Sequence, residues 1–168
     1  MILRLATLND IPAIMQIIAE VVPMMRVSGN LQWDSNYPNP TIFRQDVKLN
    51  QLWVAMVNDT VAGVAAFTTG PEPEYAAAGI DLNIPAVVTH RLAVSPRFRG
   101  MGIAAALFKQ AEVIASEKGI NYVRTDTNVK NQATTKLFPS LGYVNKGTIT
   151  LASRPGMLFY CYEKRVDM

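Results

Sequence analysis

Hydrophobic positions in the first fifty residues predict one short strand followed by two helices. Residues 2–6 alternate as a strand does, and Asn9 or Asp10 can then cap a helix with Pro12 in its first turn. Apolar residues recur after this cap at three- and four-residue spacing, which predicts a helix with one buried face: Ile11, Ile14, Met15, Ile18, Val22 and Met25. Gly29 should end this helix, and Asn39-Pro40 should open a shorter one that runs to about Asn50.

The next forty residues are rich in β-branched and aromatic side chains. Residues 52–57 and 61–69 predict an antiparallel hairpin, because the three residues between them, Asn58-Asp59-Thr60, favour a tight turn. Residues 70–84, with two prolines and two glutamates, predict a mobile loop. Residues 86–94 predict a further strand, which Ser95-Pro96 should stop.

The second half of the chain alternates helices and strands. Residues 102–118 predict a helix that ends at Gly119, and residues 122–127 predict a strand. A helix over residues 131–141, which Pro139 should kink or shorten, precedes two closing strands at 143–151 and 157–164. The order βααβββαβαββ predicts an α/β fold, an α+β mixed sheet flanked by helices.

Length and charge narrow the class of protein. The 168 residues are 49% hydrophobic, enough for one well-buried core, so we expect a single domain over residues 1–168. The net charge of +3 suggests nucleic acid weakly, and a bound polyanionic cofactor explains it as well. Because the chain has no basic stripe with interleaved aromatic residues, we expect no nucleic-acid partner.

Targeting signals and metal ligands are also scarce. Residues 1–6 lack the features of a signal peptide, and the longest apolar stretches are broken well short of the roughly 20 residues that span a bilayer. One cysteine, Cys161, excludes an internal disulfide, and one histidine leaves no ligand set for zinc. We therefore expect a cytoplasmic protein without a membrane segment or a bound metal.

The segment Arg97-Phe98-Arg99-Gly100-Met101-Gly102-Ile103-Ala104 lies between a predicted strand and a predicted helix. Two glycines allow a ligand to approach the backbone, and the helix start offers unpaired N–H groups and positive dipole. A pyrophosphate suits such a turn, and two arginines add cationic donors. The segment is not a P-loop, since no lysine or hydroxyl follows the second glycine, and it lacks the third glycine of the dinucleotide fingerprint.

These residues resemble the acyl-CoA-binding core of the GCN5-related N-acetyltransferase (GNAT) superfamily, whose motif is Gln/Arg-x-x-Gly-x-Gly/Ala. Residues 131–143 resemble the second motif of that family, Asn-x-x-Ala through x-x-x-Gly-Phe/Tyr. The resemblance implies one GNAT-like domain with a sheet of about seven strands. It also implies acetyl-CoA, or another short acyl-CoA, as co-substrate, and direct transfer of the acyl group to a primary amine.

The resemblance further implies which residues bind the co-substrate. Backbone groups of Leu92 and Val94 would pair with the pantetheine arm, and amides from Arg99 to Ala104 would hold the pyrophosphate. The full predicted set is Leu92, Ala93, Val94, Arg97, Arg99, Gly100, Met101, Gly102, Ile103, Ala104, Asn131 and Phe138. The alternatives are a glycine-rich helix start with two solvated arginines, and an Asn131 that only caps its helix.

His90 is the candidate general base, because it lies two residues before Leu92 and should share its strand face. A histidine hydrogen-bonded within the strand layer is the competing interpretation. Phe138 stands where the family frequently has a tyrosine as general acid, and it cannot donate a proton. Tyr143 is our substitute, with another tyrosine, Ser140 or water still open, whereas Cys161 should be a buried structural thiol.

The acceptor candidates come from loops. Trp33, Asp34 and Tyr37 combine an aromatic face with a carboxylate, which suits a cationic amine, and Glu72 lies in the other long loop. Aromatic residues that pin a loop to the core are the alternative. A small-molecule amine and a peptide N-terminus both remain open as acceptors, as do a homodimer and a second function, an acyl-CoA-binding sensing module with little or no turnover.

Overall fold

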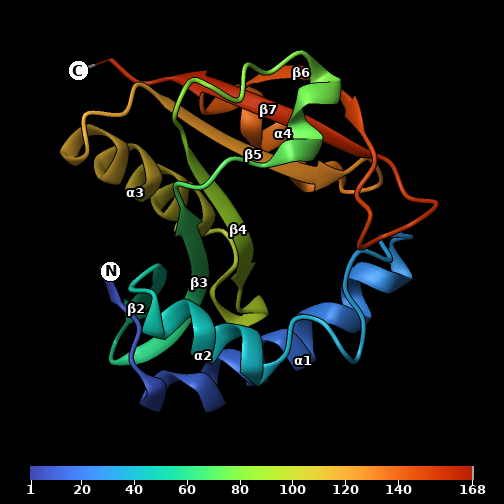
Figure 1. Ribbon diagram of the computed structural model, residues 1–168. Coiled ribbons are helices and arrows are strands. Elements are labelled where there is room, and N and C mark those ends of the chain that lie inside the picture. Colours follow the sequence, from blue (N-terminus) through green and yellow to red (C-terminus); the bar gives the residue numbers. More distant parts are fainter. Residues whose placement is uncertain (168) are drawn as a thin grey trace. The chain divides into compact units, whose positions relative to one another are not determined.

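The computed structural model describes residues 1–167 and has the predicted order of elements (Figure 1). The helices and strands are β1 Ile2–Leu5, α1 Ile11–Val27, α2 Pro40–Lys48, β2 Leu52–Val57, β3 Thr60–Thr68, β4 Val87–Val94, α3 Ile103–Glu117, β5 Tyr122–Asn128, α4 Gln132–Ser140, β6 Val144–Ile149 and β7 Phe159–Arg165. Three 3₁₀ turns accompany them: η1 Leu8–Asp10, η2 Pro73–Ala78 and η3 Pro96–Phe98.

The strands form one seven-stranded mixed sheet in the order β1-β2-β3-β4-β5-β7-β6, which confirms the predicted fold class. The chain groups into two compact units. The first unit comprises Met1–Thr68 and Thr89–Gln110, and the second comprises Thr69–Val88 and the chain from Ala111 onward. Each unit is described by itself below.

In the first unit, β1, β2 and β3 form an antiparallel meander. Ile2 pairs with Met56, and Leu52 pairs with Ala66. Asn58 and Asp59 turn the hairpin between β2 and β3 with φ angles of 48° and 60°. Two consecutive left-handed residues match the twist of the flanking strands, so the predicted tight turn is confirmed.

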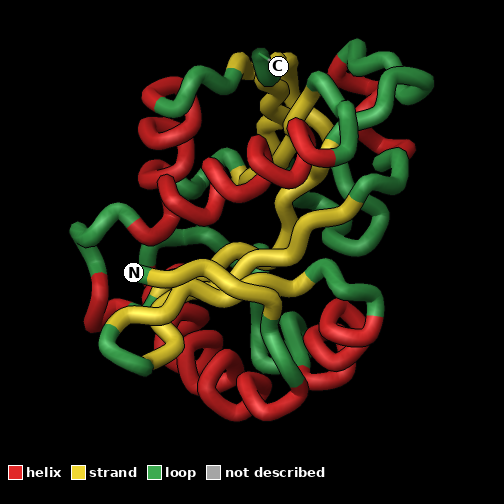
Figure 2. The backbone as a smooth tube through the Cα atoms, turned by 90° about the vertical axis from the view of Figure 1, so that its left-hand side faces the viewer, coloured by secondary structure: helices red, strands yellow, loops and turns green. Residues whose placement is uncertain are grey.

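Helices α1 and α2 cover one face of these strands, as both views show (Figures 1 and 2). Their apolar side chains and those of the strands form one core cluster: Ala6, Ile11, Ile14, Ile17, Ile18, Val22, Trp33, Phe43, Leu52, Val54, Val64, Ala66 and Ala93. The predicted helical stripe is therefore confirmed in its inner part, while Met15 and Met25 lie at its margin, only partly buried. The cap of α2 is also as predicted, because the Asn39 side chain accepts a hydrogen bond from the Ile42 amide at 3.0 Å.

The first turns of α3 lie against the opposite face of β3, at Gly63. A Cβ atom at Gly63 would lie 2.7 Å from Ile103 Cγ2 and 3.3 Å from Leu107 Cδ1. Only a residue without a side chain lets the helix approach the strand so closely. Because helices cover both faces of β3, the strand is buried almost continuously from Ala62 to Phe67 rather than alternately.

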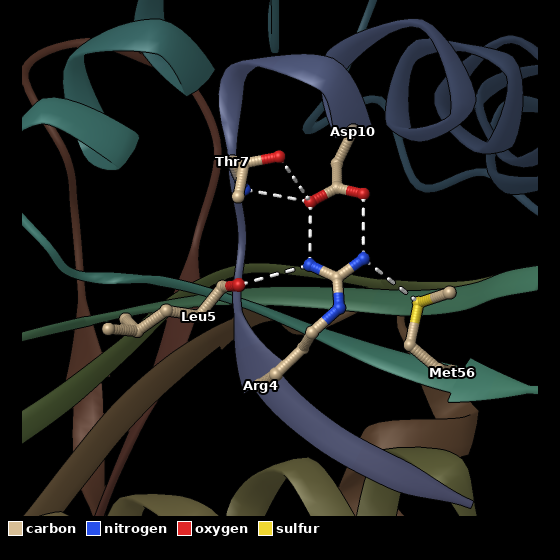
Figure 3. Close-up of polar contacts among 5 residues, drawn as sticks. All are labelled: Arg4, Leu5, Thr7, Asp10 and Met56. Atoms are coloured by element: carbon tan, nitrogen blue, oxygen red, sulfur yellow. Dashed lines mark hydrogen bonds and ion pairs between the residues drawn. The ribbon is translucent and has the colours of Figure 1, made fainter. Parts of the chain in front are cut away.

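The start of α1 is fixed to β1 by an ion pair (Figure 3). Arg4 donates two hydrogen bonds to the carboxylate of Asp10, at 2.8 and 2.9 Å, and the Thr7 amide donates a third at 2.7 Å. The hydrogen bond from Arg4 is the main reason why the pKa of Asp10 is lowered. Because the pKa of Asp10 is lowered in the folded protein, its ionised carboxylate stabilises the fold at pH values above the ordinary pKa of aspartate. This stabilisation is lost as the pH falls and the carboxylate is protonated.

The helical stretch Leu8–Val27, 20 residues long, is apolar enough to cross a membrane by length and composition alone. This finding corrects the expectation that every apolar stretch is too short, because that expectation counted uninterrupted runs rather than the average over a helix. Ile14 and Ile18 on this helix are at most 3% exposed and belong to the core cluster. The same length and composition also fit the core helix of a soluble protein, and one face of α1 packs into this cluster while Val27 at its end is exposed.

In the second unit, β7 pairs antiparallel with both β5 and β6. A buried cluster forms beside these strands from Tyr75, Ile80, Val88, Ile149, Phe159 and Cys161. Tyr75 belongs to η2, is 1% exposed, and donates its hydroxyl to Asp126 at 2.5 Å. The prediction of a mobile loop over residues 70–84 missed this 3₁₀ turn, because one aromatic side chain anchors it in the core.

Helix α4 begins with Asn131 as its N-cap, whose side chain accepts from the Thr134 amide at 3.3 Å. Pro139 lies in the last turn of the helix, where the Leu141 amide still bonds to the Leu137 carbonyl at 3.1 Å. The helix ends at Ser140, so Pro139 marks the end of α4, as expected, without a break in its middle.

We predict that Gly63→Ala destabilises the protein by about 1–3 kcal/mol, because the added methyl group collides with Ile103 where the helix rests on the strand. Urea unfolding of both proteins measures the change. Gly70→Ala is the matched control, since nothing lies within 4 Å of a Cβ at that position. Equal unfolding free energies for the two variants would contradict the close approach of α3 to β3.

Candidate active site

The predicted phosphate turn begins where β4 ends. The Ser95 amide donates to the Ala62 carbonyl at 2.8 Å, which ties the strand end to β3, and the Ser95 hydroxyl caps η3 by accepting from the Arg97 amide. Gly100 and Gly102 then have φ angles of 77° and 75°. Left-handed residues in such a turn point successive N–H groups toward one side, which makes a concavity for an anion.

The start of α3 leaves backbone donors toward this turn. The Ala106 amide donates to the Gly102 carbonyl at 3.0 Å, and this bond closes the first turn of the helix. The amides of residues 103–105 precede it and, by helix geometry, have no carbonyl within the helix to bond. Nothing lies within 4 Å of a Cβ at Gly100 or Gly102. The turn therefore fits a pyrophosphate, which would accept from these amides at the positive end of the helix.

The two arginines of the turn are exposed and contact α1. Arg97 forms an ion pair with Glu20, with 2.9 Å between Nη2 and Oε1, and Arg99 lies 3.6 Å from the Met24 sulfur. The Arg97 side chain is 61% exposed, so the pair is a surface contact that solvent screens. Both guanidinium groups are therefore accessible to a phosphate at the turn, which would compete with Glu20 for Arg97.

The strand β4 contains the second part of the predicted site. Ala93 is buried in the core, whereas Leu92 and Val94 are partly buried. Arg91 has a φ angle of 51°, which is uncommon for a residue with a long side chain. A left-handed residue interrupts the alternation of a strand, so the expectation that His90 and Leu92 share a face does not follow from their spacing.

The side chain of Arg91 is held by α2. Its Nε and Nη2 atoms donate to the two carboxylate oxygens of Asp46 at 2.8 and 2.7 Å. Burial acts to lower the pKa of Arg91, and the hydrogen bonds that Arg91 donates to Asp46 and Tyr37, with their charges, outweigh it and raise the pKa above its ordinary value. The guanidinium therefore stays charged, and the pair joins α2 to β4.

His90 contacts the end of the neighbouring strand. Its Nε2 atom lies 3.1 Å from the Thr68 hydroxyl, and either group can be the donor, depending on the tautomer. When Nε2 donates, the lone pair is on Nδ1. The contact thus supports the interpretation of a hydrogen-bonded strand histidine and leaves the role of base as a prediction.

The predicted acceptor residues of the loop before α2 differ in their burial. Trp33 is 5% exposed and belongs to the core cluster of α1 and α2, which favours the alternative that it pins the loop. Asp34 accepts from the Asn36 and Tyr37 amides at 2.7 and 2.9 Å and so shapes the loop. Tyr37 is partly buried, and its hydroxyl lies 3.4 Å from Arg91 Nη1. Within this unit the Tyr37 hydroxyl contacts Arg91 of β4, the strand of the predicted cofactor site, whereas Trp33 is buried in the core cluster that also contains Ala93.

The remaining candidates lie in the second unit. Phe138 is 1% exposed and packs edge-on against Tyr162, with 4.9 Å between ring centroids, and lies 5.7 Å from the Tyr143 ring. Tyr143 is 4% exposed, and burial, followed by the charge of Glu112, raises its pKa well above the ordinary value. The hydroxyl thus remains protonated, as a donor must, within an aromatic cluster. Glu72 is partly buried and precedes η2.

Two further expectations concern nucleophiles and metals. Cys161 is fully buried, and its burial raises the pKa of the thiol to about 12, so it is the inert structural thiol that the sequence predicted. Within residues 1–167, no group of three or more histidine, cysteine, aspartate or glutamate side chains is arranged to hold a metal ion.

Comparison with known proteins identifies the family to which this fold belongs. The family model of the acetyltransferase (GNAT) family matches residues 21–143, a span that includes β4, the turn and α3. An acetyltransferase of this family from Streptococcus agalactiae is 28% identical, with a TM-score of 0.84 over 99% of this chain and 96% of that one. No curated protein matches the chain. The chain belongs to the acetyltransferase (GNAT) family, and the family defines it as an acyltransferase of the N-acetyltransferase type.

Two solved structures with lower identity share the fold. One is yncA from Salmonella typhimurium with its cofactor acetyl-CoA, 19% identical with a TM-score of 0.71, over 100% of this chain and 95% of that one. The other is a ribosomal-protein-alanine N-acetyltransferase from Brucella melitensis, also 19% identical, with a TM-score of 0.72 over 98% and 99% of the two chains.

The sequence did not indicate three polar residues that the structure places around this site. Asp46 and Glu20 lie on the helices α2 and α1, where nothing in the pattern shows that each meets an arginine far along the chain. Arg91 gave a signal that could have been used, since a charged residue within the predicted strand needs a partner where the strand is buried.

We predict that Glu20→Gln strengthens CoA binding about 2- to 5-fold at low salt, because it removes the carboxylate that competes with phosphate for Arg97. Calorimetry at low and high ionic strength measures the change, which should shrink as salt screens the charges. Asp59→Asn in the β2–β3 turn removes the same charge elsewhere and should leave the affinity unchanged. Weaker binding by Glu20→Gln would instead mean that Glu20 orients Arg97 for the phosphate.

Proposed function

We propose that the protein transfers an acetyl group from acetyl-CoA to a primary amine by direct attack of the amine on the thioester. Acetyl-CoA supplies the activated acyl group and the thiol that leaves. The acceptor is a small-molecule amine or a peptide N-terminus. The alanine N-acetyltransferase from Brucella melitensis, which shares the fold, supports keeping the second of these acceptors in the test panel.

The turn between β4 and α3 is the observation that carries this proposal. It combines two left-handed glycines that face open space with two exposed arginines. It also contains the start of α3, where the first hydrogen bond within the helix is donated by the Ala106 amide and the amides before it have no carbonyl within the helix to bond. An anion of the size of a pyrophosphate can accept from several amides there at once. The structure of yncA, which shares the fold and contains acetyl-CoA, supports acetyl-CoA as the ligand of this chain.

The chain's own residues have separate tasks in this proposal. Residues 99–104 bind the pyrophosphate, and the backbone of Leu92 and Val94 orients the pantetheine arm. His90, which is hydrogen-bonded to Thr68, removes a proton from the attacking ammonium group, directly or through water. Tyr37 belongs to the acceptor side, because its hydroxyl contacts Arg91 of β4 and its side chain is only partly buried.

One observation favours a second candidate function, a sensing module that binds acyl-CoA and turns it over slowly or not at all. Phe138 has no proton to donate, and Tyr143, our substitute for the general acid, is almost fully buried. Binding without release of thiol in the presence of any acceptor would support this second function.

We predict that the protein binds acetyl-CoA and that Gly102→Ala weakens the binding at least tenfold, because a methyl group would occupy the open space assigned to the ligand and would strain a left-handed position. Calorimetry measures the affinity, and thiol release against a panel of amines, amino sugars and peptides identifies the acceptor class. No binding by the unchanged protein would overturn the proposed function.

The control for this experiment is Gly119→Ala at the other end of α3. Gly119 has a φ angle of 67° and open space around it, so the substitution imposes a similar backbone strain. Both variants should lose about 1–2 kcal/mol of stability. Only Gly102→Ala should lose affinity, and equal losses of affinity would place the ligand elsewhere.

We predict that His90→Gln lowers kcat by about 100-fold or more, because glutamine keeps a hydrogen-bonding group but is not a base. CoA affinity should change little, since the substitution leaves the turn intact. Thr68→Val tests the contact at 3.1 Å and should lower kcat less. Full activity of His90→Gln at every pH tested would exclude a role for His90 in proton transfer.

A further inference from the structure

Arg91 has a backbone conformation that its own side chain disfavours. Its φ angle is 51°, and it lies between His90 and Leu92 inside β4. Among residues 1–167, the other left-handed residues with side chains are asparagine or aspartate in turns, at Asn50, Asn58 and Asp59, and these residue types tolerate the conformation. A long side chain keeps such a conformation inside a strand only where its surroundings hold it there.

The surroundings of Arg91 supply such a hold. Both oxygens of the Asp46 carboxylate accept from the guanidinium, in a forked contact that fixes its plane as well as its position. The two side chains are 12% and 2% exposed, so little solvent weakens the contact. The Tyr37 hydroxyl lies at 3.4 Å from the remaining nitrogen, Nη1.

Asp46 is itself a fixed anchor. It belongs to α2, whose Phe43 is fully buried in the core. Gln51 donates its side-chain amide to Asp46 Oδ1 at 2.8 Å and its backbone amide to the Asp46 carbonyl at 3.1 Å. The Gln51 carbonyl accepts from the Phe67 amide of β3 at 2.8 Å. The carboxylate therefore cannot move without disturbing both the helix and the sheet.

We propose that Asp46 and Arg91 are positioning residues: their ion pair holds residue 91 left-handed and thereby directs the backbone of Leu92 to Val94 toward acyl-CoA. The part of this inference that concerns the ligand rests on the proposed function. Neither side chain needs to touch the co-substrate. The pair also links β4 to Tyr37, so that the acceptor side and the acyl-CoA strand share one support.

The test compares two double variants, Asp46→Asn/Arg91→Ala and Asp46→Asn/Arg91→Gly. Both remove the ion pair without leaving a charged carboxylate buried alone. Glycine adopts the left-handed conformation freely, whereas alanine does not. At an ordinary strand position alanine is the more stable of the two. Because both variants lack the pair, residue 91 should relax, and we expect the ordinary order, with the higher urea midpoint for the alanine variant. A higher urea midpoint for the glycine variant would show that the rest of the fold, and not the pair, requires a left-handed residue 91, and it would contradict the inference.

The second readout is CoA affinity by calorimetry, with kcat and KM measured on the same proteins. Alanine lets the strand relax, so we expect the alanine variant to bind CoA at least tenfold more weakly than the unchanged protein. The glycine variant should lie between them, because it permits the left-handed backbone without enforcing it. The loss should appear mainly in KM for acetyl-CoA, since the pair acts on the strand that binds it.

A matched ion pair in the same unit serves as control. Asp10→Asn/Arg4→Ala removes another forked contact, which fixes α1 to β1 rather than β4. It should lower the urea midpoint and leave CoA affinity unchanged. If it weakens CoA binding as much as the loss of Arg91 does, the effect reflects general destabilisation and the inference is wrong.

Other outcomes also decide the question. Alanine and glycine variants with the ordinary order of stability, and with CoA affinity equal to that of the unchanged protein, would show that the pair only stabilises the fold. If the unchanged protein binds no CoA, the proposed function fails and the ligand part of the inference fails with it. The order of the two urea midpoints would still decide whether the ion pair holds residue 91.

Discussion

The close packing of α3 on β3 at Gly63 is the constraint on which the candidate site depends. Ile103 and Leu107 rest where a side chain on the strand would otherwise lie, so the helix can begin only a few residues after the end of β4. The chain must therefore reverse through a short turn, and left-handed glycines make that reversal without strain. The amides that could bind an anion are thus a consequence of how the helix meets the sheet.

A second constraint acts on the strand itself. In a regular strand β4, the side chains of residues 90 and 92 would lie on the same face. The left-handed Arg91 interrupts this alternation, and Asp46 of α2 holds its side chain in an ion pair. The direction of the strand's backbone is therefore determined by a helix that lies distant in sequence. In this family member, the guanidinium group of Arg91 belongs to the strand that we propose binds the co-substrate, and it also contacts Tyr37 in the loop before α2.

The sequence predicted features that depend on neighbouring residues. The Asn39-Pro40 cap, the Asn58-Asp59 turn, the order of elements and the glycine turn all follow from local backbone preferences, and the structure has them. It did not predict features that depend on distant partners. The left-handed Arg91 requires Asp46, the η2 turn requires a core that accepts Tyr75, and the burial of Trp33 requires the packing of two helices. Periodicity carries no information about which residues meet across such distances.

Cys161 has a practical consequence for experiments on this protein. It is the single cysteine of the sequence, it is fully buried, and its thiol has a pKa of about 12. A thiol-specific dye in the assay of released CoA will therefore see almost no background from the folded protein. Any slow labelling of Cys161 itself reports how often the strands β5 and β7 open to solvent, so the same reagent also measures local unfolding of the second unit.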